Sequence, residues 1–135
     1  MQADLLKGIK IVDFTTYAAA PCSVRVLADW GADVIKVEGF SGDPMRAFGA
    51  NLGDTPYNEE ENPVWEYENG NKRGISVDLK TEKGMEIMHK LLSEADAFVS
   101  NVRAASLDKL GLSYEKLHEK YPKLVVGVIS GYGLY

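Results

Sequence analysis

Two clusters of basic and amide side chains are the groups in this sequence best suited to bind an anion. The first is Asn69-Gly70-Asn71-Lys72-Arg73-Gly74, which Lys80 follows. The second is Asn101-Val102-Arg103, which Lys109 follows. Arginine binds phosphate through a planar fork of donors and lysine as a point charge. A solvated turn is the favoured interpretation of the first cluster, whereas the second fits a phosphate site and plain surface equally well.

A third candidate is a loop of small residues at positions 15–21, Thr-Thr-Tyr-Ala-Ala-Ala-Pro. Small side chains let a backbone approach a ligand closely, and free N–H groups at the start of the helix expected next would favour an anion. The loop lacks the G-x-G-x-x-G spacing, which disfavours a nicotinamide or flavin dinucleotide site.

The remaining reactive residues give no candidate catalytic or metal site. Cys22 has no histidine near it in the sequence, so a buried, inert thiol is expected. His89 and His118 lie among charged residues in helical patterns, which is typical of surface positions. No histidine, cysteine or carboxylate group has the spacing of metal ligands.

Alternating strands and helices must position these candidates. Apolar patterns predict strands at 8–14, 33–38, 74–78, 97–100 and 124–129. They predict helices from Pro21, as first residue, to a stop at Gly31, over 82–94, over 104–110, and from a Ser113 cap to Pro122. This alternation is typical of an α/β fold with a mostly parallel sheet and helices on both faces. Ligands bind such sheets beyond the carboxyl ends of the strands, where the candidate loops lie.

Two further segments bear on the organisation of the chain. Residues 39–63 are rich in Gly, Asp, Asn, Pro and Glu without a sustained period, which predicts a long surface loop of the kind that is often functional. The sequence stops in the loop Gly131-Tyr132-Gly133, directly after a predicted strand. We therefore expect residues 1–135 to be the N-terminal part of a larger domain.

Composition narrows the function. The chain has 135 residues, 45% of them apolar and 26% charged, which is enough to bury a core. A formal net charge of −5 disfavours nucleic-acid or membrane-surface partners, although a local basic cluster can still bind an anion. A single cysteine and the absence of a signal or membrane-spanning pattern predict a soluble cytoplasmic protein.

Ordered motifs give the sequence a family resemblance. They are residues 6–13, 20–22, 27–38, 42–46, 71–80, 95–96 and 130–133. In this order they resemble the family III CoA-transferases, which include the formyl-CoA:oxalate and crotonobetaine/carnitine CoA-transferases. The phrases at 61–63, 68–72 and 101–103 most resemble the (R)-2-hydroxyacyl branch, which moves CoA onto 2-hydroxyisocaproate or phenyllactate.

The resemblance implies a Rossmann-like CoA-binding domain, a second smaller domain and a homodimer of interlocked protomers. It implies acyl-CoA and carboxylic acid substrates and no prosthetic group. In the family, an aspartate attacks the acyl-CoA to give a mixed anhydride and then an aspartyl-CoA thioester, which divides one difficult exchange into easier steps. That aspartate and a glycine-rich loop are expected beyond Tyr135, so residues 1–135 alone are expected to be inactive.

The resemblance, together with the second cluster, gives eight candidate CoA-binding residues: Ala18, Ala19, Val77, Lys80, Asn101, Val102, Arg103 and Lys109. Ala18 and Ala19 would lie near the thioester, Val77 and Lys80 at the nucleotide end, and Asn101 and Val102 along the pantetheine arm. Lys109 stands where the family has an arginine that contacts phosphate. Ala18, Gly39 and Val102 depart from the family pattern, which leaves the individual contacts open.

Two alternatives remain at this point. The 2-methylacyl-CoA racemases share this fold and these motifs, and their acid/base pair would also lie beyond Tyr135. A non-catalytic CoA-binding module is the other, although an unfinished sheet would leave an apolar edge and face uncovered. An aspartate in the sequence that follows would indicate a transferase, whereas a His/Asp pair would indicate a racemase.

Overall fold

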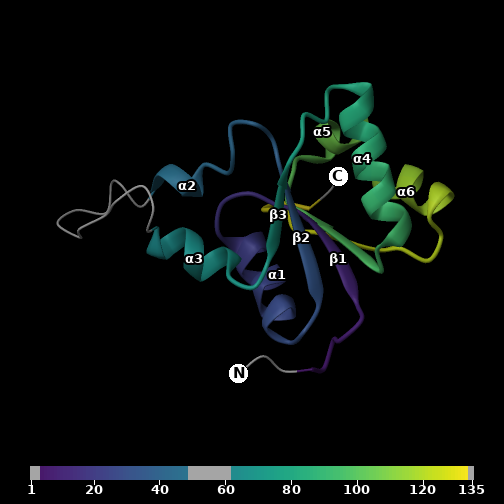
Figure 1. The fold of residues 1–135 in the computed structure, drawn as a ribbon. Coiled ribbons are helices and arrows are strands. Elements are labelled where there is room, and N and C mark those ends of the chain that lie inside the picture. The colour runs from purple at the N-terminus through teal and green to yellow at the C-terminus, as the bar shows by residue number, and fades with distance from the viewer. Residues whose placement is uncertain (1–3, 49–61, 134–135) are drawn as a thin grey trace.

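The computed structural model describes residues 4–48 and 62–133, which form a parallel sheet with helices on both faces (Figure 1). The strands are β1 (Lys10–Phe14), β2 (Asp33–Glu38), β3 (Arg73–Ser76), β4 (Ala97–Ser100) and β5 (Val125–Val128). They lie in the order β3-β2-β1-β4-β5, and each neighbouring pair is parallel. The predicted fold class is confirmed.

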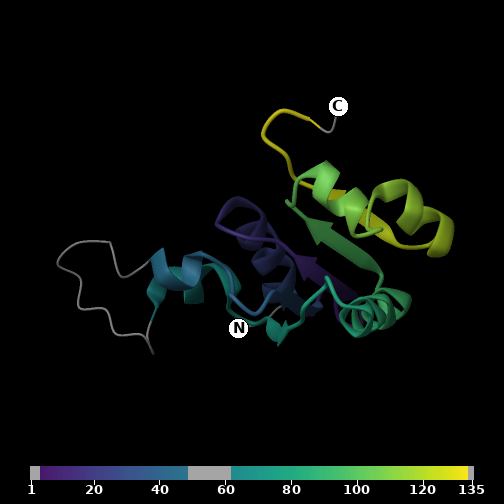
Figure 2. The ribbon, with the colours of Figure 1, turned by 90° about the horizontal axis from the view of Figure 1, so that it is seen from above.

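Helices connect the strands and cover the sheet. They are α1 (Ala19–Asp29), α2 (Met45–Phe48), α3 (Pro63–Asn69), α4 (Glu82–Glu94), α5 (Ala104–Lys109) and α6 (Tyr114–Lys120). From above, α1 lies on one side of the sheet and α4, α5 and α6 lie on the other (Figure 2). The chain adds β2 and β3 on one side of β1 and then returns to add β4 and β5 on the other side. Right-handed crossovers therefore put the helices of the two halves on opposite faces.

The central strand divides the core by alternation. Ile11 faces α1 and packs with Val24, whereas Val12 faces the other helices and packs with Met88 and Phe98. Successive side chains of a strand point to opposite faces, so Asp13 points to the α1 side again. This strand therefore delivers a carboxylate under the loop that follows it.

Most predicted elements agree with the structure. Strands β2 and β4 and helix α4 have the predicted ends, and the other strand predictions overlap the observed strands. Helix α1 begins at Ala19, so the prediction that Pro21 is its first residue was wrong. Proline is tolerated throughout the first turn, because those N–H groups have no acceptor within the helix. Gly31 follows α1 with a φ of +99°, as expected of a stop residue.

The predicted 39–63 loop contains helical structure at its ends. Helix α2 begins at Met45 and α3 begins at Pro63, while residues 49–61 lie outside the described part of the chain. The side chain of Asn62 caps α3 by accepting a hydrogen bond from Trp65 N–H at 2.9 Å. Asparagine followed by proline is a recognised helix start, so the sequence held a signal for α3 that its polar surroundings obscured.

The start of α4 depends on a close approach of two backbone segments. The Thr81 hydroxyl caps the helix by accepting a hydrogen bond from Gly84 N–H at 3.0 Å. A Cβ atom at Gly84 would lie 1.9 Å from the carbonyl oxygen of Asp78, so no larger residue fits there. This packing fixes the turn that carries Lys80.

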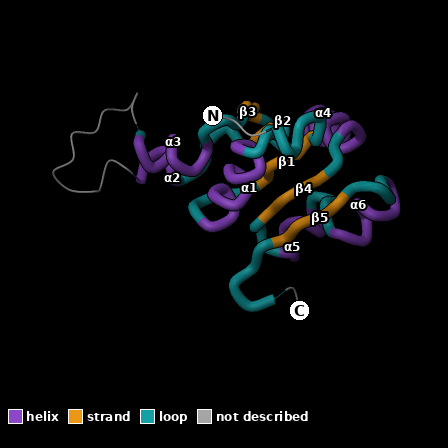
Figure 3. The backbone as a smooth tube through the Cα atoms, turned by 90° about the horizontal axis from the view of Figure 1, so that it is seen from below, coloured by secondary structure: helices purple, strands orange, loops and turns teal. Residues whose placement is uncertain are grey.

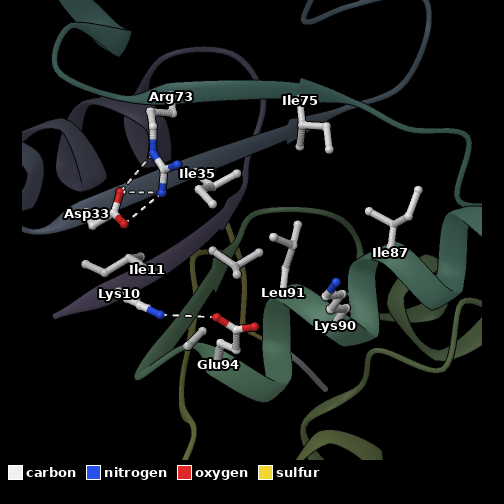
Figure 4. A pocket seen from close by; sticks show the side chains of 12 residues that line it. Lys10, Ile11, Asp33, Ile35, Arg73, Ile75, Ile87, Lys90, Leu91 and Glu94 are labelled. Atoms are coloured by element: carbon white, nitrogen blue, oxygen red, sulfur yellow. Dashed lines mark hydrogen bonds and ion pairs between the residues drawn. The ribbon is translucent and has the colours of Figure 1, made fainter. Parts of the chain in front are cut away.

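An apolar groove of about 480 Å³ lies on the α4 side of β1, β2 and β3 (Figure 4). Ile35, Ile75 and Ile87 line it, and the Asp33–Arg73 ion pair at 2.7 Å borders it. The first residues of β1, β2 and β3 are among its lining residues, so it lies toward the amino ends of the strands. The groove is therefore separate from the ligand-binding edge that the topology predicts.

Candidate functional site

The carboxyl ends of the strands bring the candidate loops to one edge of the sheet, as the tube drawing shows (Figure 3). A hollow of about 570 Å³ at this edge is lined by Ala19, Asn101, Val102 and Arg103. Residues 129–133, which follow β5, form its other wall. The sequence identified this last loop as a strand end but did not propose its residues as ligand contacts.

A second hollow, of about 640 Å³, lies beside the first. Lys80 and Lys109 line it, together with Thr81 and Ser106. Helix α5 separates the two, because Ala104 lines the first and Lys109 the second. The structure therefore places six of the eight predicted residues in two hollows that flank α5.

The other two predicted residues lie elsewhere. Ala18 is exposed and directly precedes Ala19. Val77 is only 5% exposed, and its side chain belongs to the core beneath α4. The side chain of Val77 therefore supports the turn before α4 from below and does not face either hollow.

Three basic side chains at this edge are not neutralised. Within residues 4–48 and 62–133, Lys80, Arg103 and Lys109 have no acidic side chain within ion-pair distance. Lys80 and Arg103 are exposed, as is Lys109, so each can reach a ligand in water. These three cations outnumber Glu82, the acidic residue that lines the two hollows, and so give a protein of net charge −5 a locally positive edge.

The first basic cluster has a different role. Lys72 is buried and donates a hydrogen bond to Asp13 at 2.8 Å, and Arg73 pairs with Asp33 at 2.7 Å. Burial lowers the pKa of Lys72, and the nearby Asp13 carboxylate opposes that effect. The solvated-turn interpretation was wrong for Lys72, because this side chain joins α3 and β1 inside the fold. The cluster is structural and offers no free phosphate ligand at Lys72 or Arg73.

Asn101 fastens the first loop to β4. Its side-chain oxygen accepts from Thr16 N–H at 2.9 Å, and its side-chain nitrogen donates to Thr16 C=O at 2.8 Å. Ser100 supports the same junction, because its hydroxyl donates to Phe14 C=O at 2.9 Å and accepts from Val102 N–H at 3.1 Å. The amide of Asn101 is thus already engaged, and this residue lines the hollow while holding its wall in place.

A buried network of charges supports the loop from the α1 side. Lys36 donates to Thr15 C=O at 2.8 Å, and its ammonium lies 3.1 Å from Asp43 Oδ2. The Thr15 hydroxyl donates to Asp13, which is paired with Lys72. No sequence pattern predicted this network, because lysines in a strand and a turn are ordinarily solvated.

Glu68 on α3 is the unusual member of this region. The residue is 3% exposed, and its Oε2 atom has no hydrogen-bond partner in the structure. Burial raises the pKa of Glu68, and the negative charge of Asp43 raises it further. The positive charges of Lys36 and Lys72 oppose this rise.

The remaining reactive groups form no active centre. Cys22 is half-buried, so the expected full burial was wrong, and partial burial raises the pKa of its thiol. His89 is half-buried against Tyr121, with its Nδ1 atom 3.0 Å from the Tyr121 hydroxyl, so the expected surface position was wrong for this histidine. Among the described residues, no group of three or more His, Cys, Asp or Glu side chains could hold a metal ion. No helix in the described ranges is long and apolar enough to cross a membrane.

Known proteins share this arrangement. The chain is 49% identical over 129 residues to the (R)-2-hydroxy-4-methylpentanoate CoA-transferase of Clostridioides difficile. It is 45% identical over 130 residues to the cinnamoyl-CoA:phenyllactate CoA-transferase of Clostridium sporogenes. Each match covers 96% of this chain but only 32% and 31% of the respective relative, so the chain spans about a third of their length.

Structural similarity and the family model agree with the sequence relatives. The crystal structure of a CAIB/BAIF family protein from Brucella suis superposes with a TM-score of 0.84 at 36% identity, covering 96% of this chain and 34% of that one. The model of CoA-transferase family III matches residues 6–135. The predicted resemblance, including its 2-hydroxyacyl branch, is confirmed, and the chain belongs to CoA-transferase family III.

Proposed function

We propose that this chain forms the CoA-binding part of an enzyme that transfers CoA between an acyl-CoA and a 2-hydroxy carboxylic acid. The names of the two relatives above support this class of substrate. The observation that carries the proposal is the set of unneutralised cations Lys80, Arg103 and Lys109 around the two hollows. CoA carries a phosphorylated nucleotide at one end and a narrow pantetheine arm at the other.

The two hollows suit these two ends of CoA. Lys80 and Lys109 provide positive charge for phosphates in one hollow. The other hollow is lined by the small side chains of Ala19 and Ala104 and by the apolar side chain of Ile129. Such a lining fits a thin chain that ends in a thioester. Ala18 is the N-cap of α1 and Ala19 is its first residue, and the N-terminus of this helix favours the partial negative charge of the thioester carbonyl oxygen.

The carboxylate that attacks the acyl-CoA is proposed to lie outside residues 1–135. Asp13 is fully buried and paired with Lys72, so it cannot reach a thioester. The Asp78 side chain accepts from Lys80 N–H at 3.0 Å and thereby shapes the turn before α4. These two aspartates are structural. The mixed anhydride and aspartyl-CoA thioester would then form on another part of the enzyme, with CoA held here.

Isothermal titration of the 135-residue chain with CoA, dephospho-CoA and pantetheine tests the proposal. We expect affinity to fall in that order as phosphate groups are removed. Lys109→Ala should raise the dissociation constant for CoA about tenfold, because one charge-assisted contact is lost, and Lys109→Arg should restore it. Lys90→Ala is the control, since Lys90 lines the apolar groove. Equal affinity for the three ligands, or an equal loss with both alanine variants, would contradict the proposed site.

A further inference from the structure

Tyr17 has a backbone conformation that bulky residues rarely adopt. Its φ angle is +60°. Among the described non-glycine residues, only Asn71, at +63°, also has a positive φ angle. Asparagine tolerates this left-handed region, whereas an aromatic residue there is strained. Such strain persists only where the surroundings over-determine the conformation, and it is concentrated at functional sites.

Two side chains impose this conformation from opposite sides. Asp43 Oδ1 accepts a hydrogen bond from Tyr17 N–H at 3.1 Å. Asn101 holds both backbone groups of the preceding residue, Thr16. Neighbouring peptide groups of the loop are thus fixed by the segment after β2 and by the segment after β4. The next residues along the chain are Ala18 and Ala19.

Asp43 is itself rigidly held. It is 2% exposed, and its Oδ1 atom accepts a second hydrogen bond, from Met45 N–H at 3.0 Å. Its own N–H donates to Glu38 Oε2 at 2.8 Å. Its other oxygen, Oδ2, faces the ammonium of Lys36 at 3.1 Å. One buried carboxylate therefore has two separable roles, because Oδ1 holds the loop and Oδ2 balances a buried charge.

We propose that Asp43 is a positioning residue for CoA binding, which acts by holding Tyr17 in its left-handed conformation and so presetting the loop that carries Ala18 and Ala19. The inference rests on the proposed function, because it concerns the same site. A loop that is already ordered loses little conformational entropy when the ligand binds. The hydrogen bond from Tyr17 N–H to Asp43, which we call the clamp, therefore increases the affinity for CoA although Asp43 does not contact CoA. No sequence motif marks this role, since Asp43 precedes a proline in a segment that reads as a loop.

The two roles of Asp43 can be separated on a Lys36→Met background. Methionine keeps most of the length of the lysine side chain and removes its charge, so a neutral residue at position 43 then leaves no unpaired lysine at position 36. Adding Asp43→Asn retains an Oδ1 acceptor for Tyr17 N–H, whereas adding Asp43→Ala removes it. The two double variants differ in the side-chain amide at position 43, whose Oδ1 atom also accepts from Met45 N–H, and both lack the ion pair.

Amide hydrogen exchange and CoA titration are measured on both double variants, the Lys36→Met parent and the wild type. In the Asn variant, exchange at Tyr17 and affinity for CoA should stay within about twofold of the Lys36→Met parent. In the Ala variant, exchange at Tyr17 should quicken about tenfold and the dissociation constant for CoA should rise by a similar factor, the loss expected for one buried hydrogen bond. The melting temperatures of the two double variants, measured by thermal unfolding, should differ much less than their affinities for CoA.

Three outcomes would overturn the inference. Equal CoA affinity of the two double variants, with faster exchange at Tyr17 only in the Ala variant, would show that the clamp exists but does not serve binding. Equal exchange at Tyr17 would show that Asp43 does not hold the loop. A wild-type chain that fails to bind CoA would refute the proposed function, and the positioning role with it, whatever the exchange rates.

Discussion

At the scale of single residues, the environment of each basic side chain separates ligand binding from structure. Lys72 lies in the first asparagine-containing cluster and Lys109 follows the second, yet the Lys72 side chain is buried against Asp13, whereas Lys109 is exposed without an ion-pair partner in the described chain. The Lys72–Asp13 hydrogen bond joins residues 59 positions apart. Local sequence cannot reveal such a partner, so the pattern of the first cluster could not decide between a turn and a buried pair.

Glu68 provides a pH test at this scale. Because burial and Asp43 raise the pKa of Glu68 in the folded state, folding binds a proton that the unfolded chain releases. Its contribution to stability is therefore fully present below the ordinary carboxyl pKa and is lost as pH rises through the raised value.

Glu68→Gln should raise the melting temperature at pH 7 relative to the wild type, and the gain should vanish as the pH falls below the ordinary carboxyl pKa. Thermal unfolding across this pH range measures the effect. Glu66→Gln, on the exposed side of the same helix, is the control and should show no such pH-dependent gain. A gain that is constant with pH would show that folding does not raise the pKa of Glu68.

At the scale of elements, the apolar patterns predicted most of the sheet and the longest helix. Strand β2 has a nearly continuous apolar run, and helix α4 has apolar residues at helical spacing. Each pattern indicates one kind of element. Short helices were harder to predict from the sequence. Helix α3, for example, has only seven residues and is stabilised by contacts to a distant segment. The amide of Asn62 donates to Met45 C=O and Arg46 C=O, both at 2.9 Å, and thereby joins α3 to α2.

The caps of α3 and α6 make a prediction at this scale. Asn62→Ala should destabilise the fold by about 2–4 kcal/mol, because it removes a helix cap and two buried hydrogen bonds. Ser113→Ala should lower the free energy of unfolding by less than about 0.5 kcal/mol. Ser113 precedes α6 but does not make the capping hydrogen bond that the sequence predicted. Chemical denaturation of both variants measures the difference. Similar costs would show that the Asn62 contacts contribute little.

At the scale of the whole molecule, the topology explains why the candidate residues meet. Strand order reverses on either side of β1, so the loops after β1 and β4 lie next to each other at the carboxyl edge. The sequence predicted this edge and six of the residues that line its two hollows. It could not predict that Val77 points into the core or that the Asn101 amide is hydrogen-bonded to Thr16 in the loop, because both depend on packing between distant segments.

The same topology separates the charged edge from the apolar groove. The groove lies at the amino ends of the strands, and four of the five charged residues that line it are paired, as Lys10–Glu94 at 3.2 Å and Asp33–Arg73 at 2.7 Å. The hollows at the carboxyl edge instead have lysines without acidic partners in the described ranges. The apolar lining of the groove suits an apolar ligand, whereas charge and topology favour the edge for an anionic ligand such as CoA.

The most direct test of this account is a titration of the isotope-labelled chain with CoA, followed by amide chemical shifts. The account predicts that the shifts concentrate in residues 15–19, 80–82, 101–110 and 129–133, with Ile35, Ile75 and Ile87 of the groove unchanged. Shifts concentrated in the groove, or none at the carboxyl edge at saturating CoA, would contradict the central claim that this edge binds CoA.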